Sequence, residues 1–270
     1  MSDSARAVRI TKLHSEQTHL TEDLVAHEEP LELQVDGTSL AVVMRTPGHD
    51  EELGLGFLLT EGVVKSAADI ESLRHCTTVP TPEAEDNVLQ VRLRRPVDLA
   101  RLKRHFFATS SCGVCGKATI DAALTVAQPI DSPVRITRAQ LAKLPLELGT
   151  AQPTFAQTGG LHAAALFDEH GALRVAREDV GRHNAVDKVV GWAARSSFST
   201  SQGVLLVSGR VSFELVQKAV AARVPVLAGV SAPTSLAVSM AHALGVTLVG
   251  FLRGDSMNVY AHPERIVESR

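Results

Sequence analysis

The chain has 270 residues, of which 44% are apolar, enough for one large domain or two unequal lobes. Its 27 basic and 30 acidic residues give a net charge of −3, which argues against a broad basic surface for nucleic acid. Three cysteines cannot build a secreted disulfide framework, the N-terminus lacks the apolar core of a signal peptide, and no apolar run approaches the roughly 20 residues that cross a bilayer. We therefore expect a cytoplasmic protein that neither spans a membrane nor binds nucleic acid.

The N-terminal part of the chain predicts a tail and then a small lobe. Residues 1–20 are polar and aperiodic, so we expect a flexible, loosely held tail. Beyond it, two β-rich runs are joined across Asp36-Gly37, a pair that tolerates the positive φ of a tight hairpin turn. A capped helix and an alternating strand are predicted next, over residues 46–62 and 87–94. We assign residues 21–100 to an N-terminal α+β lobe.

The rest of the chain predicts a helical connecting region, residues 101–150, and an α/β core, residues 151–270. Helices are expected in and near the connecting region over residues 97–107, 117–127 and 137–148. Strands and helices then alternate, a pattern that builds a mostly parallel or mixed sheet flanked by helices. The expected strands are 161–167, 172–178, 203–209, 225–229 and 246–253, and the expected helices are 182–195, 212–222 and 233–244.

Two cysteines lie three positions apart in SSCGVCGK, residues 110–117, where small residues provide almost no apolar cover. Such a pair can hold half of a zinc site, cycle as a disulfide or carry sulfur as a persulfide. Zinc would need two further ligands from scattered histidines, and thioredoxin-like chemistry favours a pair that directly follows a strand. Persulfide chemistry fits better, because neighbouring cations favour the reactive thiolate: Arg101, Lys103, Arg104, His105 and Lys117. Cys112 and Cys115 are therefore candidate catalytic residues, whereas Cys76 has no partner spacing and is expected to be structural.

Three loops that follow predicted strands are candidates for binding an anion: residues 205–210, 227–235 and 250–256. Loops at the carboxyl ends of parallel strands, with free N–H groups at the starts of helices, are where open α/β sheets hold phosphates. Arg210 and Arg253 strengthen this interpretation, since a guanidinium can bind a phosphate through two hydrogen bonds. None of the loops has a complete dinucleotide-binding fingerprint, so each can also be a plain turn with a helix cap.

The segment REDVGRHNAVDKVVG collects polar side chains at the start of a predicted helix. Arg182, His183 and Asn184 directly follow a glycine and can face an anionic ligand, whereas Asp179 or Asn184 can be nothing more than a helix cap. In that plainer interpretation, Asp187 and Lys188 form a solvated helix face. The segment is thus both a candidate ligand contact and an ordinary helix start.

Several segments together resemble the FdhD family of formate dehydrogenase accessory sulfurtransferases. The matching segments are EEPLELQVDGTSLAVVMRTPGHDEELGLGFLLTEG, SSCGVCG, TGGLHAAALF, REDVGRHNAVDKVVG, LLVSGRVSFELVQKA and SAPTSLAVSMAHALGVTLVGFLRGDSMNVY. They run from about residue 28 to residue 262, nearly the whole expected folded region. The resemblance implies a homodimer and a core related to the cytidine deaminase fold.

The resemblance also implies an activity. Such a protein accepts sulfur from a cysteine desulfurase as a protein persulfide, and passes it to the molybdenum or tungsten bis-molybdopterin guanine dinucleotide cofactor destined for formate dehydrogenase. Carried over by position, Cys112 bears the persulfide and Cys115 is its companion. The guanine dinucleotide is expected at Phe251, Leu252, Arg253, Gly254, Asp255 and Ser256, in the α/β core. No resident metal ion is implied.

Two other functions remain open from the sequence. The first is a cofactor carrier or chaperone that uses no covalent sulfur relay. The second is a zinc-dependent nucleotide deaminase, because His27-Glu28-Glu29 matches the H-x-E half of that signature. Ser111, however, stands where the other half of the signature has proline, which favours coincidence.

Overall fold

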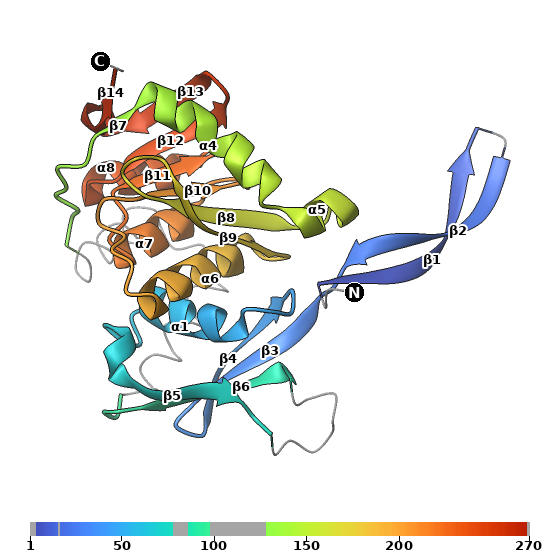
Figure 1. Cartoon of the computed structure of the whole chain (residues 1–270). Coiled ribbons are helices and arrows are strands. Elements are labelled where there is room, and N and C mark those ends of the chain that lie inside the picture. The colour runs from blue at the N-terminus through green and yellow to red at the C-terminus, as the bar shows by residue number, and fades with distance from the viewer. Residues whose placement is uncertain (1–3, 16, 78–85, 98–127, 269–270) are drawn as a thin grey trace.

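The computed structural model describes residues 4–15, 17–77, 86–97 and 128–268. They form a larger lobe on a six-stranded sheet, a smaller lobe on a four-stranded sheet, and a two-stranded arm (Figure 1). The mixed α/β architecture and the smaller N-terminal α+β lobe that the sequence predicts are confirmed. Within the described residues, no helix has the length and apolar character needed to cross a bilayer.

The sheet of the larger lobe has the strand order β13-β12-β11-β10-β8-β9. Strands β10, β11 and β12 are parallel, whereas β8, β9 and β13 pair antiparallel with their neighbours. The strands are β8 (His162–Phe167), β9 (Leu173–Asp179), β10 (Val204–Val207), β11 (Val226–Gly229), β12 (Thr247–Arg253) and β13 (Ser256–Ala261). The short central strands are apolar throughout, because both faces of the sheet are covered.

Helices cover both faces of this sheet. One face packs against α6 (Arg182–Arg195), α7 (Phe213–Ala221) and α8 (Ser235–Leu244), and the other packs against α4 (Arg138–Thr150). Alternate residues of β10 divide between them: Leu205 faces the three helices, and Leu206 faces α4. Helix α4 is thus part of the core, although the sequence had placed it in a connecting region. Most of that region, residues 98–127, lies outside the described residues.

The smaller lobe lays helix α1 across one face of a sheet with the order β4-β3-β6-β5. Its elements are β3 (Glu29–Val35), β4 (Thr38–Arg45), α1 (Asp50–Thr60), β5 (Ile70–His75) and β6 (Val88–Leu93). The predicted hairpin turn is confirmed, since Asp36 and Gly37 have φ angles of 47° and 77°. Leu31 and Leu33 on β3 pack against Leu53 of α1, and a second cluster around Leu58 and Val91 completes the core of the lobe.

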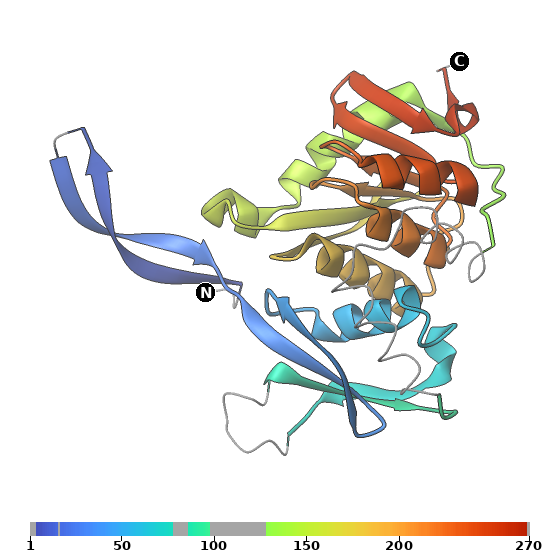
Figure 2. The same ribbon diagram turned by 180° about the vertical axis from the view of Figure 1, so that it is seen from behind.

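The two lobes meet where α1 crosses α6. A Cβ atom at Gly56 would lie 1.8 Å from the carbonyl oxygen of Asp187, and one at Gly191 would lie 1.8 Å from the carbonyl oxygen of Glu52. Only glycine permits backbones to approach so closely. The pair of glycines therefore fixes the seam between the lobes, which Figure 2 shows from behind.

The first strands of the chain form an arm that projects away from both lobes (Figures 1 and 2). Strands β1 (Ala5–His14) and β2 (Gln17–Ala26) pair antiparallel over their full length. The predicted tail of residues 1–20 is therefore wrong for residues 5–14 and 17–20, because a hairpin exposed on both faces has no apolar alternation to reveal it.

The remaining short elements are α5 (Pro153–Thr158), β7 (Ile136–Thr137), β14 (Ile266–Val267) and the 3-10 turns η1 (Ala67–Asp69) and η3 (Pro263–Arg265).

Candidate functional site

The parallel strands β10, β11 and β12 end at the same edge of the large sheet. We call this the carboxyl edge and define it by His162 and residues 180–183, 208–214, 230–234 and 251–256. Strand β9 runs in the same direction as β10, so helix α6 also starts there, and β8 starts there with His162. Such edges are the usual ligand sites of open α/β sheets.

The loops of the carboxyl edge are tied to one another by backbone contacts. Val211 and Pro233 form a parallel bridge between the loops after β10 and β11. The Phe251 amide donates a 3.1 Å hydrogen bond to the Ser231 carbonyl, which joins β12 to the second loop. The Ser208 hydroxyl accepts a 2.9 Å hydrogen bond from the Ala163 amide, which joins the first loop to β8. The edge is thus one connected surface.

The loop after β10 offers hydrogen-bond donors to an anion. Within the described residues, the amides of Gly209 and Arg210 have no acceptor. A Cβ atom at Gly209 would lie 3.1 Å from Nδ1 of His162, so glycine keeps the space beside these amides open. The Arg210 side chain is exposed at the same place. The first of the three predicted anion-binding loops therefore has the donors that a phosphate needs.

Arg182 supplies a positive charge beside this loop. Its Cδ atom would lie 3.7 Å from a Cβ at Gly209. Its Nε atom is buried and has no hydrogen-bond partner in the described part of the chain. A buried guanidinium nitrogen without a hydrogen-bond acceptor is costly, and an anion bound beside Gly209 would supply the missing acceptor. Burial lowers the pKa of His162, and the charges of Arg182 and His183 lower it further, so the neutral imidazole is favoured there at pH 7.

A cluster of three side chains lies at the start of α7. The Ser212 hydroxyl donates a 2.7 Å hydrogen bond to Glu214, and Nε2 of His183 lies 3.4 Å from the same carboxylate oxygen and 3.5 Å from the hydroxyl. The interaction with His183, followed by that with Ser212, lowers the pKa of Glu214 to about 2 against the opposing effect of burial. Glu214 thus stays ionised and orients the His183 ring at the carboxyl edge.

The third loop predicted to bind an anion, the one after β12, does not have the expected structure. Residues 250–256 do not lead into a helix, because Gly254 and Asp255 form the tight turn of the β12–β13 hairpin, with Arg253 paired to Ser256. Gly254 adopts a positive φ of 54°, which this turn requires. Of the three loops predicted to bind an anion, those after β10 and β11 therefore lead into a helix, and the one after β12 does not.

The predicted guanine-dinucleotide stretch contains both buried and exposed side chains. Leu252 is fully buried in the core beneath α4. Phe251 is 38% exposed and has a positive φ of 51°, an unusual conformation for a large residue. Arg253 is exposed, and its Nε donates a 3.4 Å hydrogen bond to the Val230 carbonyl. An aromatic ring and a guanidinium are thus presented together at the carboxyl edge.

Cys112 and Cys115, the predicted catalytic pair, lie outside the described residues. Their roles therefore stay predictions. Cys76 is buried, and its amide donates a 2.8 Å hydrogen bond to the Val88 carbonyl, an environment that fits the predicted structural thiol.

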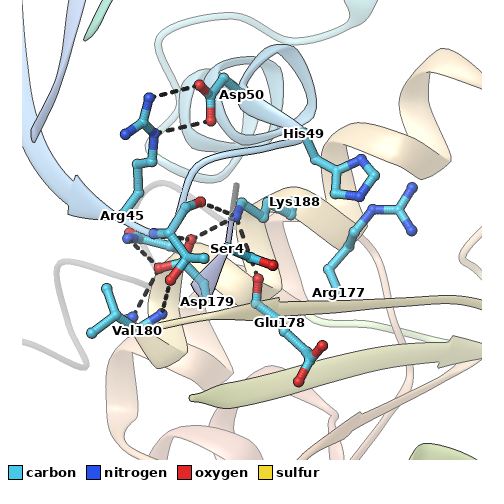
Figure 3. A network of polar contacts seen from close by, with 12 residues as sticks. Ser4, Arg45, His49, Asp50, Arg177, Glu178, Asp179, Val180 and Lys188 are labelled. Atoms are coloured by element: carbon cyan, nitrogen blue, oxygen red, sulfur yellow. Dashed lines mark hydrogen bonds and ion pairs between the residues drawn. The ribbon is translucent and has the colours of Figure 1, made fainter. Parts of the chain in front are cut away.

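The polar segment that includes the start of α6 also contacts the smaller lobe, through a network in which Figure 3 labels Asp179 and Lys188. Lys188 lies 2.7 Å from Asp179 and donates a 2.8 Å hydrogen bond to the Thr46 carbonyl of the smaller lobe. Asn184 donates hydrogen bonds to Asp179 and to the Met44 carbonyl. The expectation of a solvated face at Lys188 is wrong, since its side chain is 1% exposed.

A second buried cation lies at the other end of the seam. Lys218 of α7 lies 2.9 Å from Asp187 of α6 and 2.8 Å from Glu61, and it also donates to the Thr60 hydroxyl. Burial raises the pKa of Asp187, whereas the pKa of Lys218 is raised by its two carboxylates although burial opposes them. Asp187 is therefore a seam residue and not the solvated residue that the sequence suggested.

Comparison with known proteins decides the family. The model of the FdhD/NarQ family matches residues 26–267 of this chain. The chain belongs to the FdhD/NarQ family. The resemblance inferred from the sequence is confirmed. The family match contains both lobes and the carboxyl edge, and it begins at the base of the arm.

Relatives within the FdhD/NarQ family cover nearly the whole chain. The sulfur carrier protein FdhD of Mycolicibacterium paratuberculosis is 50% identical over 264 residues, which are 96% of this chain and 97% of that protein. The protein of the same name from Streptomyces avermitilis is 54% identical over 251 residues, 90% of this chain and 89% of that protein. A crystal structure from Desulfotalea psychrophila, described as a formate dehydrogenase accessory protein, shares the fold with a TM-score of 0.76 and 24% identity, and covers 97% of this chain and 99% of that chain.

Proposed function

We propose that this protein is a cytoplasmic sulfurtransferase that matures formate dehydrogenase. The Cys112 thiolate attacks the outer sulfur of a persulfide on a cysteine desulfurase, breaks the S–S bond and releases the thiolate of the donor. Cys112 then carries that sulfur as its own persulfide and passes it to the metal of the molybdenum or tungsten bis-molybdopterin guanine dinucleotide cofactor. In that transfer the S–S bond at Cys112 would break, the Cys112 thiolate would leave, and the reduced metal of the cargo would supply the two electrons that convert the outer sulfur to sulfide. The names of the relatives, sulfur carrier protein FdhD, support this role.

The single structural observation that supports the proposal is the unpaired buried nitrogen of Arg182 beside two free amides. A guanine dinucleotide carries a pyrophosphate, whose negative charge needs donors of this kind. Arg182, with the amides of Gly209 and Arg210, would hold the phosphates. The exposed ring of Phe251 would stack on a base, with Arg253 nearby. The cofactor is cargo here, and the carboxyl edge provides the place where it waits for sulfur.

A cofactor carrier without covalent sulfur transfer would use the same edge, so the test must separate the two roles. The measurement is formate dehydrogenase activity in cells that lack the endogenous accessory protein and express variants of this chain. We expect Cys112→Ala to abolish maturation, and the buried-thiol control Cys76→Ala to retain it. Full maturation by the double variant Cys112→Ser/Cys115→Ser would contradict sulfur transfer. If Arg182→Gln abolished maturation in the same assay, that result would favour the carrier.

A further inference from the structure

A cavity lies away from the carboxyl edge, where the base of the arm, the smaller lobe and the end of α6 meet. Its volume is about 830 Å³, within the range of small-molecule sites. Arg6 of the arm, Arg45 of the smaller lobe and Trp192 of α6 are among the residues that line it. Helix α6 starts at the carboxyl edge with Arg182, about 15 Å along the helix from Trp192. The cavity is therefore separate from the proposed nucleotide site.

Arg45 brings a buried donor to this cavity. Its surface is 0% exposed, and its Nε and Nη2 atoms donate hydrogen bonds of 3.1 and 2.9 Å to the Asp50 carboxylate (Figure 3). Its Nη1 atom is buried and lies 3.5 Å from the Glu29 carboxylate, yet it has no hydrogen-bond partner among the described residues. A buried guanidinium nitrogen without an acceptor is costly, so a ligand oxygen that accepts from Nη1 would be bound favourably.

His75 has a second unfilled hydrogen-bonding position. Its Nε2 atom lies 3.5 Å from Oδ2 of Asp50, the same oxygen that accepts from Nη2 of Arg45. Its Nδ1 atom is buried and has no hydrogen-bond partner in the part of the chain that the structure describes. Both nitrogens of a protonated imidazole donate, so a ring that faces Asp50 can also hold a ligand carboxylate. Nδ1 of His75 and Nη1 of Arg45 can therefore share one anionic group.

The charges around the cavity favour a ligand that carries both signs. Glu29 and Asp50 lie 3.5 and 2.9 Å from the Arg45 guanidinium, so they would largely cancel its attraction for a simple anion. The carboxylate of Asp86 is exposed and forms no ion pair with another described residue, although its backbone carbonyl accepts a 2.9 Å hydrogen bond from Arg45. A carboxylate that can bind a cation thus lies beside the nitrogens that can bind an anion.

Trp192 gives the cavity an apolar wall. Glu51, which directly follows Asp50 in α1, pairs with Arg195 and so places the last turn of α6 next to Asp50. Trp192 stands in that turn, is partly exposed and lines the cavity. An indole face binds apolar and aromatic groups. The cavity therefore combines a polar end with an apolar surface nearby.

We propose that this cavity binds a free α-amino acid with a large apolar side chain. The carboxylate of the amino acid accepts hydrogen bonds from Arg45 and His75, and its ammonium group donates to the Asp86 carboxylate. Its side chain packs against Trp192. Each charge of the ligand then meets its opposite, and the two buried nitrogens gain an acceptor. The proposal does not depend on the sulfur chemistry.

The first test uses the fluorescence of Trp192, the one tryptophan of the chain, which reports on this cavity directly. Adding L-phenylalanine to the full chain should change that fluorescence with a dissociation constant of about 1 mM or lower. L-phenylalaninamide lacks the carboxylate and hydrocinnamate lacks the ammonium group, so each should bind about tenfold more weakly or worse. No change in fluorescence up to about 10 mM L-phenylalanine, or equal binding of either analogue, would overturn the proposal.

A second test removes the contact to the ammonium group. Asp86→Asn keeps the backbone carbonyl that Arg45 contacts, so the guanidinium stays in place. This variant should bind L-phenylalanine about tenfold more weakly than the parent, and no better than it binds hydrocinnamate. Asp131→Asn is the matched control, since Asp131 is exposed and is not among the residues that line the cavity, and its affinity should equal that of the parent. An Asp86 variant that still prefers L-phenylalanine to hydrocinnamate would refute the arrangement.

Discussion

Lys188 and Asp179 form a 2.7 Å ion pair that is withdrawn from water, with side chains 1% and 0% exposed. Lys188 also reaches the Thr46 carbonyl, and Asp179 accepts hydrogen bonds from the amides of Thr46 and Gly181. The pair therefore links the smaller lobe to the segment that begins α6. Because Arg182 directly follows Gly181, the same pair helps to position Arg182 at the carboxyl edge.

Replacing Lys188 by methionine should destabilise the protein severely. The substitution leaves the Asp179 carboxylate buried without its cation, which costs about 3–5 kcal/mol in the free energy of unfolding. The measurement is urea denaturation followed by circular dichroism. Lys143→Met is the matched control, because Lys143 is exposed on α4 and its loss should change the free energy by about 0.5 kcal/mol or less. Equal effects of the two substitutions would show that the buried pair is unimportant.

The glycines of the seam should not tolerate even a methyl group. Gly56→Ala places a Cβ 1.8 Å from a backbone oxygen, so the helices must separate, and we expect a loss of about 3 kcal/mol or more. Gly149→Ala on α4 is the control, since its Cβ would meet no atom within 4 Å and alanine favours the helix by about 1 kcal/mol. Thermal unfolding of the two variants should therefore shift in opposite directions. A Gly56→Ala variant as stable as the parent would contradict the close crossing of α1 and α6.

The carboxyl edge should bind GDP, the part of the proposed cargo that carries the pyrophosphate. Arg182→Gln removes a charged donor, and a charge-assisted hydrogen bond contributes about 1.5–3 kcal/mol, so the affinity should fall tenfold or more. Isothermal titration calorimetry measures this loss. Arg174→Gln, at the other end of β9, should leave the affinity unchanged. If GDP binds both variants equally well, the phosphates lie elsewhere.

Glu214 should titrate far below an ordinary glutamate, with a pKa of about 2 in place of 4.5. The folded-state pKa is lowered, so the stabilisation from Glu214 is present above pH 4.5 and is lost as the pH falls toward 2. His183→Ala removes the largest cause and should raise the pKa of Glu214 toward 4.5, as seen by NMR titration of its carboxyl carbon. His162→Ala should leave the value near 2. An unchanged titration in the His183 variant would exclude this histidine as the cause.

The sequence alone predicted those elements whose boundaries depend on residues adjacent to them in the chain. Helix α6 begins and ends where predicted, at Arg182 and Arg195, because a glycine precedes it and apolar residues recur along its buried side. The Asp36-Gly37 turn was equally predictable, because few residue pairs accept two positive φ angles. At the carboxyl edge, Arg182, Arg210 and Arg253 were recognised as candidates from their place after glycines or strands.

Features that depend on distant contacts were not predictable in the same way. Nothing near Lys188 in the sequence shows that Thr46 and Asp179 surround it, so its charge suggested solvent. The unpaired nitrogen of Arg182 is likewise visible only once β10 lies beside α6. Strand β13 was missed because residues 250–256 were interpreted as a ligand-binding loop and no element was assigned after it, although the alternation from Ser256 to Ala261 is typical of a strand.

The central claim is that Cys112 holds the sulfur in transit. The most direct measurement incubates the full chain with a cysteine desulfurase and cysteine, blocks the thiols with an alkylating reagent, and determines the mass of the peptide that contains residues 105–117. Our account predicts one additional sulfur atom on Cys112, which is absent when the desulfurase is omitted and absent from Cys112→Ala. A peptide without added sulfur in the complete reaction, or equal labelling of the alanine variant, would contradict it.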